Sequence, residues 1–174
     1  MPASPSALNY TIFKAIVYIK LAGESAYRDV GNVPVATFTP SNETLDHFSS
    51  RTGVRTKDKQ IVLSKSGTLA ITFEEMTPEN LALALLGDIA VNSAGETELA
   101  IFSQNSLSGA VKIEGQNEVG AKVRAIFNNV TFNPNSEIPF ISDEWAQIEL
   151  SGEVLVDGNG DFGTYAFIGE EATA

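Results

Sequence analysis

The chain has 174 residues, with 11 lysines and arginines, 22 aspartates and glutamates, and a formal net charge of −11. This length suits a single domain over residues 1–174, and the negative charge argues against attraction to nucleic acid or to an anionic membrane. The sequence contains no cysteine, which excludes disulfide bonds, thiolate metal ligands and a thiol nucleophile.

The chain begins with an arm and two predicted strands. Residues 1–8 hold two prolines and two serines, which is typical of a flexible arm and lacks the basic and apolar regions of a secretory signal. Residues 10–21 are rich in β-branched and aromatic side chains and predict a strand, and residues 35–39 predict a second one. No stretch approaches the roughly 18 consecutive apolar residues that a membrane helix needs.

Basic residues are concentrated in one part of the chain. Five of the eleven lie within fifteen positions, where only Asp58 opposes them: Arg51, Arg55, Lys57, Lys59 and Lys65. This stretch carries +4, so the rest of the chain carries −15. We expect residues 45–60 to form a long basic loop that contacts an acidic surface, such as another copy of the chain.

One helix is predicted, over residues 77–86, after a hairpin formed by residues 60–64 and 68–74 across Ser66-Gly67. Thr77 can cap the helix, Pro78 suits its first turn, and Gly87 offers a left-handed C-terminal residue. The helix is so apolar that it must be buried against the sheet or a neighbouring subunit. The leucines that we expect to be buried are Leu81, Leu83, Leu85 and Leu86.

The remainder predicts only strands, near residues 97–102, 110–114, 121–132, 147–156 and 164–168, with a proline-containing loop at 133–141. Short strands with one intervening helix indicate a mainly β fold, an antiparallel sandwich or barrel with one flanking helix. Residues 169–174 are expected to form a C-terminal tail.

The sequence offers little catalytic or metal-binding chemistry, and we expect no enzyme activity, no cofactor and no metal. His47 is the single histidine and lies beside no nucleophile motif. Residues 157–161 resemble the start of a calcium loop, but Phe162 and Ile168 replace the required glycine and glutamate, so a turn is expected. The single tryptophan, Trp145, is expected in a core or an interface.

The C-terminal part is strongly acidic. Residues 125–174 contain nine acidic residues and no basic ones. The side chains at positions 147, 149, 151 and 153 share one face of a predicted strand. An ordinary solvated face explains this pattern, and a carboxylate-lined wall that includes Glu149 and Glu153 is the alternative.

Four segments together resemble the tail tube (major tail) proteins of long, non-contractile-tailed bacteriophages. They are residues 27–33 (YRDVGNV), 45–54 (LDHFSSRTGV), 57–59 (KDK) and 77–87 (TPENLALALLG). The resemblance implies a β-sandwich or barrel that forms stacked hexameric rings around a channel for DNA, which passes without sequence-specific binding. It also implies that Arg51, Arg55, Lys57 and Lys59 lie on a loop that reaches a neighbouring ring, and that Glu149 and Glu153 face the lumen.

The same resemblance implies the partners and the location. The partners would be other copies of the chain, a tape-measure protein and tail terminator or tip proteins, in the virion tail after synthesis in the bacterial host cytoplasm. Three alternatives remain: a tail terminator or baseplate protein of the same fold, a non-catalytic β-sandwich that binds carbohydrate or a receptor, and a hydrolase that uses carboxylates.

Overall fold

The computed structural model describes residues 4–51, 53–117, 119–134 and 137–168. Its elements in chain order are the 3₁₀ helix η1 (Ala7–Asn9), strands β1 (Ala15–Leu21), β2 (Arg28–Asp29), β3 (Val35–Ser49) and β4 (Thr56–Phe73), helix α1 (Pro78–Leu85), and strands β5 (Asp88–Val91), β6 (Thr97–Ala100), β7 (Leu107–Gly115), β8 (Lys122–Asn133), β9 (Ile148–Leu155) and β10 (Gly163–Ile168). The predicted tail at 169–174 and residues 1–3 of the predicted arm lie outside the described residues.

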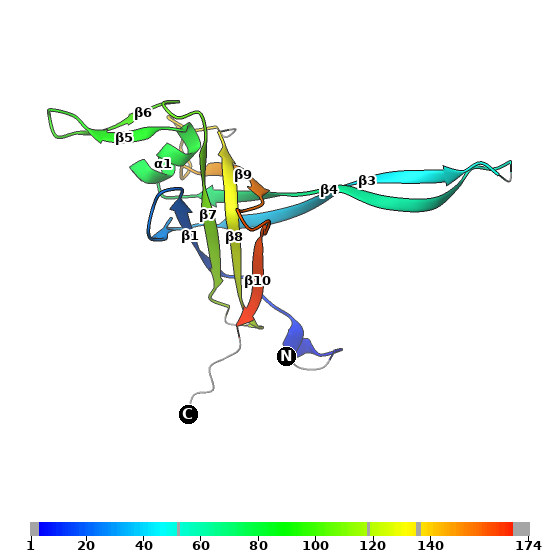
Figure 1. The fold of residues 1–174 in the computed structure, drawn as a ribbon. Coiled ribbons are helices and arrows are strands. Elements are labelled where there is room, and N and C mark those ends of the chain that lie inside the picture. The colour runs from blue at the N-terminus through cyan, green and yellow to red at the C-terminus, as the bar shows by residue number, and fades with distance from the viewer. Residues whose placement is uncertain (1–3, 52, 118, 135–136, 169–174) are drawn as a thin grey trace.

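Eight strands form one antiparallel sheet, in the order β2-β1-β7-β8-β9-β4-β3, with β10 paired to β8. Strand β8 belongs to both halves of this sheet. Its first half pairs with β10, from Lys122 to Phe127, and its second half pairs with β9, from Asn129 to Asn133. The sheet therefore folds over at β8 into two layers, and β5 and β6 form a separate hairpin (Figure 1). The predicted class, mainly antiparallel β with one flanking helix, is confirmed.

The core lies between the two layers. Alternate residues of β9, and of β4 from Gly67 onward, point into it, and the intervening ones are more exposed and mostly polar, as expected for a sheet with one solvated face. Helix α1 covers one end of the core through Leu83, which is completely buried. The buried core residues are Val17, Ile19, Val30, Leu69, Ile71, Phe73, Leu83, Val111, Val130, Phe132, Leu150 and Val154.

The structure corrects the sequence analysis between residues 35 and 73. The predicted short hairpin across Ser66-Gly67 does not exist, because β4 runs through it without interruption, and β3 is far longer than the predicted strand at 35–39. The two strands pair from Val35↔Thr72 to Ser49↔Thr56. Gly67 is needed for space: a Cβ there would collide with the ring of Phe38. A glycine that signals close packing was thus interpreted as a turn.

Two β-bulges interrupt the β3–β4 pairing. Ser64 pairs with Glu43 and Val62 with Thr44, so Leu63 has no partner across the ladder. Lys59 pairs with His47 and Lys57 with Phe48, so Asp58 is the second extra residue. Both insertions are on β4.

Helix α1 forms as the sequence predicts, with a difference at its C-terminus. The Thr77 hydroxyl accepts a hydrogen bond from the Asn80 amide at 3.2 Å, and Pro78 begins the first turn. The left-handed residue is Leu86, at φ 46°, and not Gly87. At Gly87 a Cβ would lie 2.8 Å from the carbonyl oxygen of Ala100. The absence of a side chain here allows the end of β6 to pack against the end of the helix.

Asn80 is a buried polar residue that joins α1 to its surroundings. Its side-chain amide donates to the carbonyl oxygens of Val30 and Glu75, each at 2.9 Å, and its oxygen accepts from Arg28 at 2.9 Å. The side chain is completely buried, both of its N–H donors are used, and its oxygen accepts one hydrogen bond. It therefore fixes the start of α1 against β2 and the residue that follows it, Val30.

Replacing Leu83 by alanine should lower the free energy of unfolding by about 2–5 kcal/mol, because it leaves a cavity at a completely buried site. Leu85→Ala should cost clearly less, because Leu85 is only partly buried. Urea denaturation followed by circular dichroism measures both. Equal midpoints for Leu83→Ala and the wild type would show that α1 does not depend on the core.

Replacing Asn80 by alanine should cost at least about 1–3 kcal/mol, because buried carbonyl groups lose their donors. The matched control is Asn105→Ala, at an exposed position, where the expected change is within about 0.5 kcal/mol. Thermal unfolding of the three proteins provides the comparison. A loss no larger at position 80 than at position 105 would contradict this role.

Candidate functional site

Half of the β3–β4 hairpin projects from the body as a two-stranded ribbon (Figure 1). Strand β9 supports β4 only from Gly67 to Phe73, and the pairing with β3 continues to Thr56. The predicted long loop at 45–60 is therefore the outer part of this ribbon, with strands on both sides of a short turn. A two-stranded ribbon without a third strand or a helix against it is marginally stable in water.

Large apolar side chains are exposed along the ribbon: Leu45, Phe48, Val54, Ile61, Val62 and Leu63. Each of them is at least 41% exposed. Exposed large apolar side chains gathered on a projecting element are typical of a contact with another protein chain. The ribbon therefore has the composition of an interface.

The predicted basic residues lie on this ribbon, but their charge is partly compensated. Lys57 forms an ion pair with Asp46 at 2.7 Å, and the Arg55 guanidinium lies 5.3 Å from the centre of the Phe48 ring. Arg51 and Lys59 are exposed. Residues 35–73 contain five basic and three acidic residues, a net charge of +2. The charge of +4 was counted over residues 51–65 alone. It left out Glu43 and Asp46 of β3, which strand pairing places beside this segment.

His47 also lies on the ribbon, in β3. Its Nδ1 lies 2.6 Å from an oxygen of Asp58, and its side chain is 71% exposed. No serine or threonine nucleophile is hydrogen-bonded to this imidazole in the described part of the chain. The pair is an exposed cross-strand contact between two oppositely charged or polar groups.

The outer face of the β8–β9–β4–β3 layer is polar. Because paired residues share a face, the register places Glu149 with Thr72 and Glu153 with both Thr68 and Thr131. Core residues such as Leu150 point the other way. We call this face the polar face; it consists of Thr37, Thr39, Thr68, Ala70, Thr72, Asn129, Thr131, Asn133, Glu149, Ser151 and Glu153, together with the apolar Val35 and Leu155, which pair with Thr72 and Asn129. It contains two carboxylates and no lysine or arginine.

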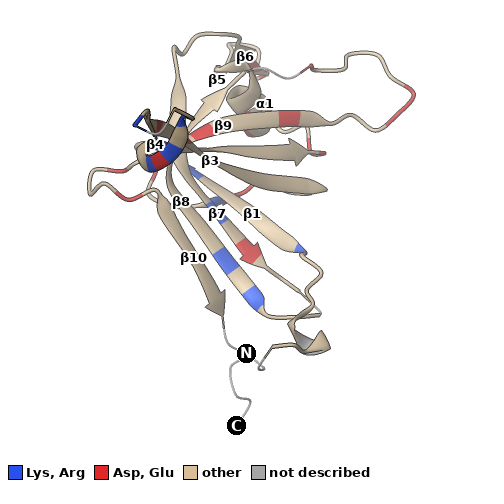
Figure 2. Ribbon diagram, turned by 90° about the vertical axis from the view of Figure 1, so that its right-hand side faces the viewer, with Lys and Arg blue, Asp and Glu red and all other residues tan. Residues whose placement is uncertain are grey.

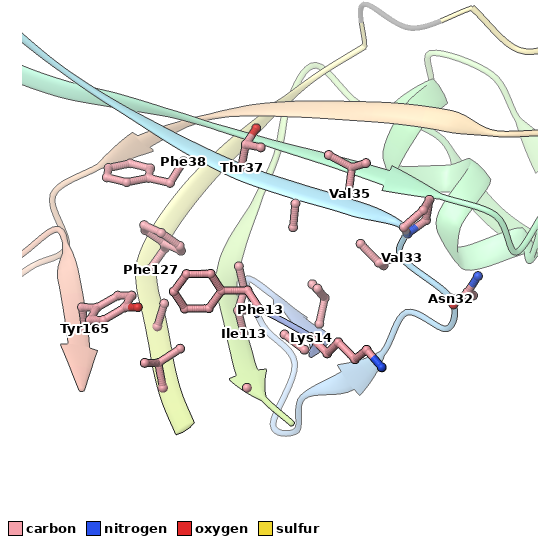
Figure 3. A pocket seen from close by; sticks show the side chains of 17 residues that line it. Phe13, Lys14, Asn32, Val33, Val35, Thr37, Phe38, Ile113, Phe127 and Tyr165 are labelled. Carbon is pink, nitrogen blue, oxygen red and sulfur yellow. The ribbon is translucent and has the colours of Figure 1, made fainter. Parts of the chain in front are cut away.

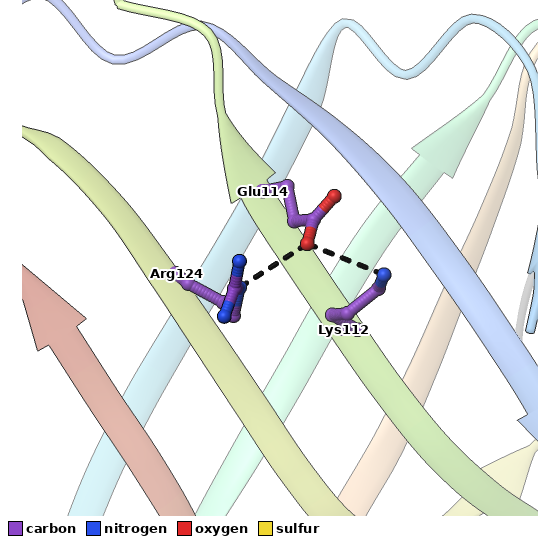
Figure 4. A network of polar contacts seen from close by, with 3 residues as sticks. All are labelled: Lys112, Glu114 and Arg124. Carbon is purple, nitrogen blue, oxygen red and sulfur yellow. Dashed lines mark hydrogen bonds and ion pairs between the residues drawn. The ribbon is translucent and has the colours of Figure 1, made fainter. Parts of the chain in front are cut away.

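The outer face of the opposite layer is basic. The Glu114 carboxylate contacts Lys112 at 3.3 Å and Arg124 at 3.1 Å (Figure 4). The Lys112 ammonium also lies 4.3 Å from the centre of the Tyr18 ring. Figure 2 shows basic positions on β7 and β8 and acidic positions on β9. Sequence analysis missed this segregation, although the alternation of charges at 112 and 114, and at 122 and 124, indicates one strand face.

The helix leucines lie at graded depths. Leu83 is completely buried and Leu86 is 8% exposed, and Leu81 and Leu85 are partly buried. Their cover is supplied by the same chain, since α1 contacts β5, β6, β8 and β9. The helix therefore closes the core and is not a free apolar surface.

The open side of the sandwich holds a cavity of about 770 Å³ between β1, β7, β8 and β3. Its lining is mostly apolar, and Phe13, Ile113, Phe127 and Tyr165 point toward it from different elements (Figure 3). Ala36 and Phe38 of β3, which pair with the core residues Ile71 and Leu69, line the other side. Lys14 and Tyr165 are the ionisable residues of this lining, which includes no carboxylate and no histidine.

The sequence that resembles a calcium loop forms the β9–β10 turn. One Asp157 carboxylate oxygen accepts from the amides of Asn159 and Asp161, at 2.8 and 3.0 Å, and the other accepts from Asn128 at 2.9 Å. These hydrogen bonds, that from Asp161 first, lower the pKa of Asp157. The carboxylate thus holds the turn closed. No cluster of three or more metal-ligating side chains occurs among the described residues.

Replacing Asp157 by alanine should lower the melting temperature at neutral pH, because the ionised carboxylate accepts turn amides only in the folded state. Since its pKa is lowered by folding, this stabilisation is present above the unfolded pKa and is lost as pH falls through the folded value. The difference between variant and wild type should therefore shrink in acid. Asp143→Ala, in an exposed loop, is the control, and a difference that does not vary with pH would contradict the assignment.

Within the described residues, no helix is long and apolar enough to span a membrane. No curated protein matches the chain. A solved structure described as "Tail of empty GTA particle computed with helical refinement, C6 symmetry" is 10% identical to it, with a TM-score of 0.47, over 89% of this chain and 96% of the other. These values are too low for that particle's symmetry to be transferred. The model of one family matches residues 10–98 and 89–166, and the chain belongs to this family, which is described as "Protein of unknown function UCP028589".

Proposed function

We propose that the chain is a non-enzymatic structural subunit of a bacteriophage-type tail tube. It assembles with copies of itself into hexameric rings that stack around a channel for DNA. The observation that carries this proposal is the projecting β3–β4 ribbon, which has exposed apolar side chains and, within the described residues, pairs with a third strand only from Gly67 to Phe73. An isolated ribbon of this kind gains stability when a neighbouring subunit covers it.

The polar face suits the wall of the channel. It presents threonine, serine and asparagine together with Glu149 and Glu153, and no basic residue. Passing DNA would find no lysine or arginine to bind its phosphates, and the two carboxylates would repel them. Six copies placed side by side would make this surface continuous, because β3 lies at the edge of the sheet.

The basic residues of the ribbon suit a contact between rings. The chain as a whole carries −11, so stacked copies repel each other unless opposite charges meet. Arg51, Arg55 and Lys59 extend positive charge away from the body on the ribbon. Each exposed pair is worth only about 0–1 kcal/mol, but the contact would be repeated by every subunit of a ring.

The proposal includes the partners and the location of such a subunit. Besides its own copies these are a tape-measure protein and tail terminator or tip proteins, in the virion tail, after synthesis in the host cytoplasm. Electron microscopy of the purified protein separates the candidates. Stacked tubes support the tube subunit, isolated rings support a terminator or baseplate protein, and monomers at all concentrations support a binding module.

Reversing two charges on the ribbon, with Arg55→Glu and Lys59→Glu together, should abolish ring stacking and leave the fold intact. Lys57 is left unchanged because it is held by Asp46. The control reverses Lys20 and Lys122, which gives the same change in net charge. Both lie on the basic outer face of the opposite layer, since Lys20 is two positions from Tyr18 on β1 and Lys122 is two positions from Arg124 on β8. Negative-stain images and circular dichroism spectra of both double variants provide the test. Tubes of wild-type length from the ribbon variant would rule out this contact.

A further inference from the structure

Among the described residues, the loop between β8 and β9 carries the three large apolar side chains that are most exposed to solvent. Phe140, Ile141 and Trp145 are 91%, 98% and 93% exposed. We call residues 137–146 the tryptophan loop. Tryptophan contributes more buried area than any other side chain and is enriched at the centres of protein interfaces. A chain that leaves all three in water has a surface suited to a partner.

The tryptophan loop is also acidic. Asp143 and Glu144 directly precede Trp145, and Glu137 lies at the start of the loop. The described residues provide no hydrogen bond or ion pair to the side chains of Asp143 and Glu144; Ser142 binds only the Glu144 amide. A partner that covers Trp145 would therefore have an apolar pocket with a cation at its rim.

The same chain presents such a pocket. A hollow of about 310 Å³ lies between β10 and the base of the β3–β4 hairpin, and we call it the aromatic pocket. It is lined by Phe38, Phe127, Phe162 and Tyr165, with the first two rings 4.9 Å apart between centres. Three of these residues, Phe38, Phe127 and Tyr165, also border the larger cavity and are seen together in Figure 3.

One basic residue lines the aromatic pocket. Lys65 is the only lysine or arginine in its lining, which includes no acidic residue. Lys65 is exposed, and the described residues give its ammonium no ion pair. The pocket and the tryptophan loop are therefore complementary both in apolar character and in charge.

The two surfaces lie at opposite ends of β9. The tryptophan loop leads into Ile148, which pairs with Phe73, whereas the aromatic pocket includes Val154 and Gly67, which pair at the other end. Six residues of strand separate these ends by about 20 Å. Complementary surfaces at two different ends of one chain give a head-to-tail contact, which forms closed rings or open filaments.

We infer that the tryptophan loop of one copy inserts Trp145 into the aromatic pocket of a second copy, with Asp143 and Glu144 against Lys65. This inference rests on the proposed self-assembly and specifies one of its contacts. It uses neither Arg55 nor Lys59, so it is independent of the ring-stacking contact. The occupant is a second copy because the complementary loop and pocket are both present on this chain.

Trp145 is the only tryptophan, so its fluorescence reports this contact directly. On assembly of the wild-type protein we expect the emission to shift to shorter wavelength and acrylamide quenching to fall severalfold, because the indole leaves water. Assembled rings or tubes in which quenching is unchanged would overturn the contact and leave the proposed function intact. A protein that stays monomeric at all concentrations would overturn both.

A charge exchange identifies the partner surface. Lys65→Glu should raise the protein concentration needed for assembly by about tenfold or more, which corresponds to about 1.4 kcal/mol. Adding Asp143→Lys and Glu144→Lys to the same chain should restore assembly and the fluorescence shift. Lys122→Glu is the matched control, because this residue lies outside the pocket. Assembly of Lys65→Glu at the wild-type concentration, with the shift retained, would overturn the assignment of the pocket.

Discussion

Strand β4 is part of both the core and the projecting ribbon, and it fixes one relative to the other. Its C-terminal part is held on both sides, by β3 and by β9, and points Leu69, Ile71 and Phe73 into the core. Its N-terminal part continues without a break into the ribbon. Since the side chains of a strand alternate strictly between two faces, the register set by the core also decides how the first part of the ribbon is oriented. The stability of the core thus positions an element that makes few contacts of its own.

The charges of the chain are arranged by face. The sequence places Glu149 and Glu153 on one face of a strand, and pairing adds neutral polar side chains of β4 and β8 to the same outer surface. Lys112 and Arg124 lie on the other outer surface, with Glu114 between them. A chain of net charge −11 therefore has one surface without cations and another with several. Such an arrangement favours ordered contact between copies over random association.

The sequence predicts local features well and long-range ones poorly. Helix α1, strands β6 to β10 and the β9–β10 turn were predicted, because capping residues, alternation and turn residues act within a few positions, whereas the short strand β5 was not predicted. The ribbon was missed because Ser66-Gly67 is typical of a turn. In the structure the glycine instead leaves the space that the ring of Phe38 occupies. Asn80 gave no signal, since its three side-chain partners are 5, 50 and 52 positions away. The pairing of Lys57 with Asp46 needed the register of two strands, which no local pattern gives.

The two bulges of β4 have a consequence for the direction in which the ribbon's side chains point. Each extra residue shifts the alternation of β4 by half a period. At Lys65 and Leu69 the odd-numbered side chains face the core side, and beyond the bulge at Leu63 the even-numbered ones do. Asp58 shifts it again and restores the original phase at Lys57. Only the segment between the bulges is inverted, which turns Val62 and not Ile61 to the core side. Bulges also increase the local right-handed twist, so the tip is rotated about the long axis of the ribbon relative to its base.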